Sequence, residues 1–487
     1  MTGKTRLCIL LLGLASVLFF WCHLTVILNA GDRTGVRLWE SGDTVQYVRT
    51  AGVLTGGGRM NPTYRERILL PVLIAISDRI FQSPIPILWL VGLLQLPATI
   101  AAAFITFHLS GRQRVSLAAA GMYVLYPNIY RRGVFLDTDV LHAQLFLFAV
   151  ALLFAFSRRS TWGRALAASV SWPLVQMARP TLFGVCPFLA VSLWTQFRDP
   201  RSRFKAVAIC CSALVVPVIS ATINLAQFGI FAPSLHAAEM LHVWAVPRIK
   251  VVQRNAETPG RVSDYFNEEI TAARADPRWR QLHGEYESTK QFAAAYRSVI
   301  SEDSSFVRRN WRDFLASAWP ILVLEVEAVP YLHDEYQARI APGPYPDGSR
   351  VLRAVYKLML IIAFCAVVSV WKTPSWRLGI LVLGAFGLIF LPASFSWWWL
   401  GGRYRIPLDV TMIPLLCIAL FERGTWLTLG GVVLLAYAPF RILGLPDTFM
   451  HVMTVAILVA YVALEWLVPE RIRERLLARR ELARTCS

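Results

Sequence analysis

The chain contains a series of long apolar blocks, and these limit its fold more than any other feature. Blocks of roughly 15 to 25 apolar residues match a bilayer core of about 30 Å, which a helix of that length crosses. The composition agrees, because 56% of the residues are hydrophobic and 16% are charged, whereas soluble domains carry about 25% charged residues. The sequence therefore predicts an all-α polytopic membrane protein and excludes an ordinary water-soluble enzyme.

About twelve transmembrane helices, within a range of roughly 11 to 14, are expected from these blocks. The predicted spans are 7–28, 87–109, 115–130, 140–157, 165–178, 182–197, 204–228, 354–371, 376–393, 405–421, 425–442 and 448–468. With this count the basic loops fall on the cytoplasmic side, as the positive-inside rule requires. About half of the excess in the formal net charge of +18 is then a topology signal. The charge is also compatible with an anionic ligand, such as a lipid phosphate, in a basic cavity, and nucleic acid is not an expected partner.

Four regions follow from this topology. Residues 1–228 form an N-terminal transmembrane module with a first outer loop at 30–86, residues 229–353 form a large outer helical region, residues 354–468 form C-terminal transmembrane helices, and residues 469–487 form a basic cytoplasmic tail.

Short apolar or amphipathic segments are expected outside the spans. Ile68–Phe81 and Phe314–Leu332 are short or carry internal charges and prolines, which predicts interfacial or re-entrant helices. In the large outer region, Arg261–Ala275 and Glu285–Arg309 have helical spacing, with a break at Asp276-Pro277.

The first outer loop carries two charged motifs. Asp43 lies just beyond the first span, where a carboxylate could accept the proton of a hydroxyl group; the alternative is a helix N-cap. Glu66 and Arg67 precede an apolar segment, where they would form a phosphate clamp with a carboxylate partner. The alternative for these charges is an anchor at the membrane interface.

The most specific cluster follows the third predicted span. Arg131 and Arg132 are followed by Asp137-Thr138-Asp139, and then by a new span. Charges this close to lipid are costly, so they indicate function by default. Paired carboxylates suit a divalent cation or a charged substrate. The alternative is a set of mutually paired charges at a helix start.

Two further arginine motifs lie near span ends. Arg179 precedes Pro180 within an apolar stretch, at a predicted outer turn from which it could reach lipid headgroups. Arg403 and Arg405 follow three tryptophans typical of a membrane interface. This arginine pair could bind a lipid phosphate bidentately or serve only as an anchor. The sequence contains no nucleotide-binding loop, Rossmann glycine pattern or zinc-protease motif.

In their order and shared placement, these motifs resemble the C-type (GT-C) integral-membrane glycosyltransferases. Gly42-Asp43 with Tyr47 resembles the acidic motif of their first loop, and Asp137-Thr138-Asp139 is similar to the Asp-Thr-Asp motif of bacterial oligosaccharyltransferases. Protein O-mannosyltransferases belong to the same superfamily. The Trp-Trp-Asp acceptor motif of oligosaccharyltransferases is absent from the sequence, which argues against protein N-glycosylation.

Two more motifs extend the resemblance. The run from Asn61 to Arg67 is similar to the Glu-Lys-Pro-Pro stretch of the lipid A aminoarabinose transferases, with Arg67 in place of lysine and without the proline pair. The run from Arg403 to Pro407 resembles a motif near the C-terminal spans of uncharacterised relatives. The resemblance covers about residues 1–200 and 390–420, and it excludes the large outer region.

The resemblance implies an inverting glycosyltransferase of the bacterial-type cytoplasmic (inner) membrane, with its active site facing the periplasm or exterior. The donor would be a polyprenyl-phosphate sugar, and the acceptor a hydroxyl of a glycan, lipid or protein. Asp43 would be the general base. Asp137 and Asp139, with Glu66 as acidic support, would position either a divalent ion such as Mg²⁺ or Mn²⁺ or the cationic side chains. The residues implied to bind the donor phosphate are Arg67, Arg131, Arg179, Arg403 and Arg405.

Other classes of function remain open at this stage. An O-antigen ligase or polymerase shares the donor class but relies on arginine and histidine rather than on an aspartate of the first loop. A transporter or flippase for lipid-linked saccharides also has a basic outward cavity, although such proteins often show internal repeats, which this sequence lacks. A structural subunit of an envelope assembly would not need charged clusters at the ends of its spans.

Overall fold

Every regular element that the computed structural model describes is a helix, so the all-α prediction is confirmed for that part of the chain. The described residues are 1–34, 43–56, 67–257, 262–283, 286, 288–317, 377, 379–385, 387 and 406–422. The bundle helices are α1 (Gly3–Thr34), α2 (Thr44–Gly56), α3 (Leu69–Phe81), α4 (Ile85–Leu93), α5 (Gln95–Ser110), α6 (Gln113–Val124), α7 (Pro127–Gly133), α8 (Asp139–Arg158), α9 (Trp162–Ala178), the 3₁₀ helix η2 (Pro180–Val185), α10 (Cys186–Trp194), α11 (Pro200–Phe228) and α21 (Ile406–Glu422).

Four stretches of helix in the described residues are long and apolar enough to cross a membrane. They are Gly3–Gly31, Ile85–Ser110, Asp139–Arg158 and Pro200–Phe228. These agree with four of the predicted spans, while α3 is a shorter helix at the place predicted for an interfacial segment. The spans predicted at 354–371, 425–442 and 448–468 and the tail lie outside the described residues, so the number twelve stays a prediction.

The predicted span 115–130 is wrong as a single helix. Helix α6 ends at Val124, and α7 begins at Pro127. Tyr126, with φ −75° and ψ 104°, is extended because the residue before a proline is pushed out of the helical region. The break places α7, with Arg131 and Arg132, on a short helix of its own.

Local sequence signals fix the ends of α11. The Asp199 carboxylate accepts a hydrogen bond from the Ser202 backbone N–H at 2.8 Å, and Pro200 occupies the first helical turn. Gly229 ends the helix with φ +64°, a backbone conformation that glycine adopts without steric cost. The helix between these signals is long enough to span the membrane.

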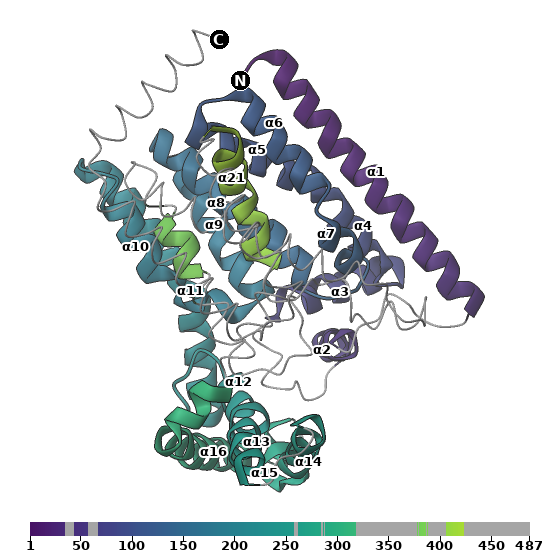
Figure 1. Ribbon diagram of the computed structural model, residues 1–487, viewed down its shortest axis with the longest axis vertical. Helices are drawn as coiled ribbons and strands as arrows, with labels where there is room; N and C mark the ends of the chain where they lie inside the picture. The colour runs from purple at the N-terminus through teal and green to yellow at the C-terminus, as the bar shows by residue number, and fades with distance from the viewer. Residues whose placement is uncertain are drawn as a thin grey trace, which may run out of the picture.

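The bundle packs around a continuous apolar core (Figure 1). Helix α1 runs along one flank and contacts α4, α5 and α6, whereas α21 packs against α5, α6 and α8. Phe20, Phe146, Phe156 and Trp172 are among the largest fully buried side chains. Residues far apart in the sequence, such as those of α8 and α21, thus form one core.

A close approach of α1 and α4 depends on Gly92. A Cβ atom at this position would lie 2.6 Å from Trp21 Nε1 and 2.7 Å from Phe20 Cδ1, closer than side chains tolerate. We expect Gly92→Leu to lower the free energy of unfolding by about 1 to 3 kcal/mol through overpacking. Thermal unfolding of the purified protein in detergent measures this. Gly121→Leu is the matched control, because a Cβ there meets no atom within 4 Å; equal melting temperatures for the two variants would contradict the assignment.

A second group of helices, here called the distal group, comprises residues 236–309 and lies beyond the end of α11 (Figure 1). Its members are α12 (His236–Glu239), the π-helix η3 (Met240–Ala245), α13 (Val246–Glu257), α14 (Val262–Ala275), α15 (Pro277–Leu282) and α16 (Thr289–Arg309). The group has its own small apolar core, which includes Ala238, Leu282, Phe292 and Val299.

The distal group corrects the expected helix boundaries. The helix predicted from Glu285 begins at Thr289, because the Ser288 side chain caps the first turn by accepting from the Gln291 backbone N–H. The predicted break at Asp276-Pro277 is confirmed, since Asp276 caps α15. The helices between residues 236 and 257 were not expected from the sequence.

Candidate active site

The Asp137–Asp139 turn lies where α8 begins, and both carboxylates are buried. Asp137 Oδ1 accepts a hydrogen bond of 2.9 Å from the Asp139 backbone N–H. Asp139 occupies the first turn of α8, where the helix dipole favours a negative charge. The backbone thus holds two carboxylates at the end of a helix long enough to span a membrane. We call this end of the bundle the charged end.

Arg179 lies at the same end, directly after α9. Its backbone is extended because Pro180 follows, and this ends α9. Its guanidinium forms an ion pair with the Asp139 carboxylate, and the two side chains are 1% and 0% exposed. Arg179 therefore does not reach lipid headgroups, which was one of the two roles predicted for it. It neutralises a buried carboxylate instead.

Helix α2 of the first loop packs onto the Asp137–Asp139 turn. The Thr44 hydroxyl donates to the Leu136 carbonyl oxygen at 3.0 Å. The Tyr47 and Thr138 hydroxyls are hydrogen-bonded at 3.3 Å. Tyr47 is fully buried, and this burial raises the pKa of its phenol. The first loop is thus anchored to the most specific motif of the sequence.

Asp43 and Arg67 meet beside the Tyr47 hydroxyl. Arg67 Nη1 donates to the Tyr47 hydroxyl at 3.2 Å and lies 3.7 Å from Asp43 Oδ2. Arg67 is largely buried, so it is not an anchor that extends to the interface, whereas the Asp43 side chain keeps 24% of its surface exposed. Asp43 also precedes α2, and its carbonyl oxygen accepts from the Gln46 and Tyr47 backbone N–H groups. Asp43 therefore lies at the start of a helix and is also paired with Arg67.

Four of the nine residues selected from the sequence therefore belong to one chain of contacts. Asp43, Arg67, Asp139 and Arg179 are linked through Tyr47 and Thr138. Asp137 adjoins them through its bond to Asp139. Arg131 lies on α7, although its side chain is outside the description, and Glu66, Arg403 and Arg405 lie outside the described residues.

Helix α21 begins near the segment between α6 and α7. The Tyr126 hydroxyl donates to Asp409 Oδ2 at 2.7 Å, which ties the first turn of α21 to the segment between α6 and α7. Asp409 follows Arg405 by four residues in the chain. The sequence contained Asp409 next to the arginine motif, but no spacing rule connects it with Tyr126, because the two are 283 residues apart.

The distal group contributes a carboxylate that the sequence did not single out. Glu239 Oε2 lies 3.1 Å from His236 Nδ1, and Glu239 Oε1 lies 3.8 Å from His283 Nδ1. Burial acts to raise the pKa of Glu239, but His236, His283 and Arg67 outweigh it and hold the pKa below its ordinary value.

In the described residues an arginine is the ion-pair partner of Asp139. Its carboxylate is paired with Arg179, and one oxygen of Asp137 is occupied by a backbone N–H group. Within the described ranges, no three histidine, cysteine, aspartate or glutamate side chains are arranged to hold a metal ion. Whether a divalent ion binds at these carboxylates stays a prediction.

Comparison with known proteins finds similarity to solved structures only. No protein family and no curated protein matches the sequence. The structure is similar to the apo form of the Archaeoglobus fulgidus oligosaccharyltransferase, with 12% identity, a TM-score of 0.43, and coverage of 93% of this chain and 55% of that one. The same enzyme tethered to an acceptor peptide containing the NVT sequon gives 12% identity, a TM-score of 0.40, and coverage of 87% and 50%. The chain thus spans about half the length of these oligosaccharyltransferase chains.

Proposed function

We propose that this protein is a membrane glycosyltransferase that moves a sugar from a polyprenyl-phosphate donor to an acceptor hydroxyl. One observation carries the proposal: the partly exposed Asp43 carboxylate lies beside Arg67, and both are linked through Tyr47 to the buried Asp137–Asp139 turn. The site thus places a proton acceptor, Asp43, beside a cation, Arg67, at the charged end of the bundle. We further propose that this end faces the periplasm or exterior of a bacterial-type inner membrane.

Asp43 is the proposed general base. The acceptor oxygen bonds to the anomeric carbon while the bond from that carbon to the phosphate oxygen breaks. The departing electron pair stays on the lipid phosphate, and the acceptor proton passes to the Asp43 carboxylate. A single displacement of this kind inverts the anomeric centre. The acceptor can be a glycan, a lipid or a protein, because the described contacts do not discriminate among them.

Arg67 is the proposed principal cation for the departing phosphate, because it lies 3.7 Å from the base and next to the anchored Tyr47. A preorganised cation stabilises the charge that builds up on the leaving group. Arg131, Arg403 and Arg405 are proposed to assist it. Arg179 forms a buried ion pair with Asp139, so we propose that it holds the Asp137–Asp139 turn in place. Binding of the donor phosphate by Arg179 would require this ion pair to break.

Binding of undecaprenyl phosphate tests this proposal. Arg67→Ala is expected to weaken binding by about 10- to 150-fold, because a charged hydrogen bond contributes about 1.5 to 3 kcal/mol. Radiolabelled lipid and the purified full-length chain in detergent give the dissociation constant. Arg79→Ala is the control, because Arg79 is an exposed arginine in the last turn of α3. If Arg67→Ala binds as tightly as the control, Arg67 has no role in holding the phosphate.

A further inference from the structure

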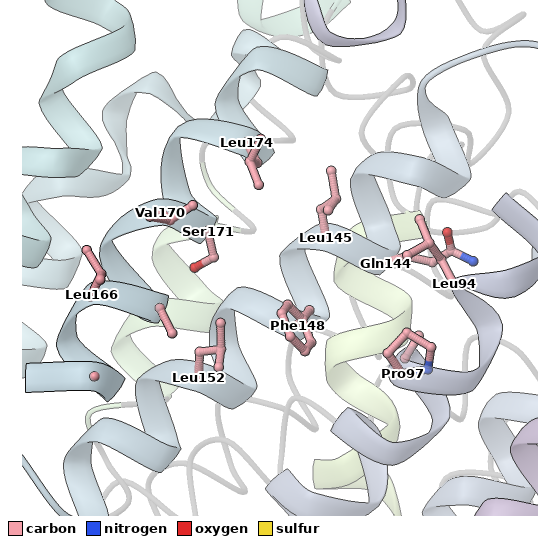
Figure 2. Close-up of a pocket in the computed structure, with 13 residues that line it drawn as sticks. Leu94, Pro97, Gln144, Leu145, Phe148, Leu152, Leu166, Val170, Ser171 and Leu174 are labelled. Atoms are coloured by element: carbon pink, nitrogen blue, oxygen red, sulfur yellow. The ribbon is translucent and has the colours of Figure 1, made fainter. Parts of the chain in front are cut away.

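The interface between α8 and α9 contains a buried histidine whose ring has no hydrogen-bond partner among the described residues. His142 is 1% exposed, and neither of its ring nitrogens forms a hydrogen bond there. It is not part of the apolar pocket between α5, α8 and α9, whose lining is shown in Figure 2. A buried polar group left without a partner costs about 1 to 3 kcal/mol. A hydrogen bond made by His142 in another state of the protein would offset this cost.

His142 lies beside the buried ion pair of the charged end. It follows Asp139 by three residues in α8, and residues at this spacing are neighbours on one face of a helix. The same face contacts α9 twice: Asp139 pairs with Arg179, and the Phe146 ring packs edge-to-face against Trp172 with centroids 6.1 Å apart. His142 lies between these two contacts, with its ring stacked on Phe146. The imidazole is thus within one helical turn of the Asp139 carboxylate.

A histidine at this spacing can bond to a carboxylate, and the distal group contains an example. His236 Nδ1 lies 3.1 Å from Glu239 Oε2, three residues further along the chain. A neutral imidazole carries an N–H donor on one of its two ring nitrogens. A change of the His142 rotamer would therefore bring a donor to Asp139, whose charge is also favoured by the dipole of α8. Asp139 thus has a second available partner besides Arg179.

We propose that His142 takes over the Asp139 carboxylate when the donor phosphate binds, and that this exchange frees Arg179 to bind the phosphate. The inference rests on the proposed function and gives Arg179 a part in it. The exchange leaves no buried charge without a partner, because the phosphate pairs with Arg179 while the histidine N–H donates to the carboxylate. No covalent bond changes and no proton is transferred. His142 is thus a positioning residue that acts through Arg179.

A freed Arg179 would lie at the same end of the bundle as Arg67. Asp139 follows Thr138, whose hydroxyl is hydrogen-bonded to the Tyr47 hydroxyl at 3.3 Å, and Tyr47 accepts a hydrogen bond from Arg67 at 3.2 Å. One continuous chain of contacts therefore connects the two arginines. The leaving phosphate gains a second negative charge as its bond to the sugar breaks, and a second arginine stabilises that charge.

Two substitutions at His142 test the exchange. Phenylalanine keeps a buried aromatic ring but offers no donor, so Arg179 would stay on Asp139. His142→Phe should raise the dissociation constant for undecaprenyl phosphate about 10- to 150-fold, the contribution of one charged hydrogen bond. His142→Gln keeps a neutral donor that can reach a carboxylate at helical spacing, so its affinity should stay near wild type. The melting temperature of His142→Phe should not fall, because the substitution removes an unpartnered buried polar group.

His108→Phe is the matched control. His108 is stacked on Phe104 and packs against Phe154, so it also has aromatic neighbours. Phe154 follows Asp139 by 15 residues, or about 22 Å along α8, which places His108 far from the ion pair. The same change of residue type is thus made in a similar environment away from the charged end.

The dissociation constant is measured with radiolabelled undecaprenyl phosphate and the purified full-length chain in detergent. The expected result is a loss of affinity in His142→Phe and Arg67→Ala, and none in His142→Gln or His108→Phe. In an Asp139→Asn background Arg179 has no carboxylate to leave, so His142→Phe should cause no further loss. This double-variant comparison shows whether His142 acts through the ion pair.

Other results would overturn the inference, and they point to different errors. If Arg67→Ala weakens binding but His142→Phe matches His108→Phe, no exchange occurs while the proposed function stands. If His142→Gln loses as much affinity as His142→Phe, the histidine only packs the interface. A loss that persists in the Asp139→Asn background would show that His142 does not act through the ion pair. If the wild type does not bind undecaprenyl phosphate, the proposed function fails, and the exchange fails with it.

Discussion

Asp43→Asn is expected to lower the rate of glycosyl transfer by about 10²- to 10⁴-fold, the usual contribution of a positioned general base. Asparagine keeps the shape of the side chain but cannot accept the proton. The fold should persist, because asparagine serves as well as aspartate at a helix start and the pair with Arg67, at 3.7 Å and partly exposed, contributes little. Glycosylated product in cells, normalised to the amount of inserted protein, measures the effect.

Asp199→Asn is the matched control for this prediction. Asp199 also precedes a helix, and its side chain caps α11 through the Ser202 N–H group. Since asparagine can make the same cap, both protein level and product should stay near wild type. A well-inserted Asp43→Asn protein with wild-type product would remove Asp43 from the mechanism. We would then assign the role of general base to Asp137 or Asp139, and an O-antigen ligase or polymerase would become the better-supported function.

Arg179→Met is expected to destabilise the protein by about 3 to 5 kcal/mol, because it leaves the buried Asp139 carboxylate without its cation. The two side chains are essentially inaccessible to solvent. The double variant Asp139→Asn/Arg179→Met should recover much of this loss, since neither member of the pair then leaves a buried charge without its partner. Melting temperatures in detergent, measured for both single variants and the double variant, give the coupling between the two residues.

The same variants separate support of the fold from support of the site. If the pair holds the Asp137–Asp139 turn for catalysis, the stable double variant should still form little product. Arg254→Met is the control, because its pair with Glu268 is exposed and should cost less than about 1 kcal/mol. A double variant as unstable as Arg179→Met would contradict the charge argument, and a fully active one would make the pair purely structural.

The sequence alone determined the helical membrane class and the selection of most candidate residues. Apolar blocks of spanning length can be satisfied in a bilayer only by helices that pair their own backbone groups, and four long apolar helices lie where such blocks occur. Charges beside lipid are expensive, so Asp43, Arg67, Asp139 and Arg179 stood out before any coordinates. Caps at Asp199 and Ser288 and the break at Pro127 are equally local effects.

The tertiary structure decided which of these charges meet. Arg179 could have faced headgroups, but the packing of α8 against α9 directs it to Asp139, 40 residues earlier in the chain. Tyr47 and Thr138, 91 residues apart, join the two halves of the site. Periodicity and capping act over a few residues, whereas these contacts depend on how whole helices pack. For that reason the sequence could select the charged residues but could not pair them.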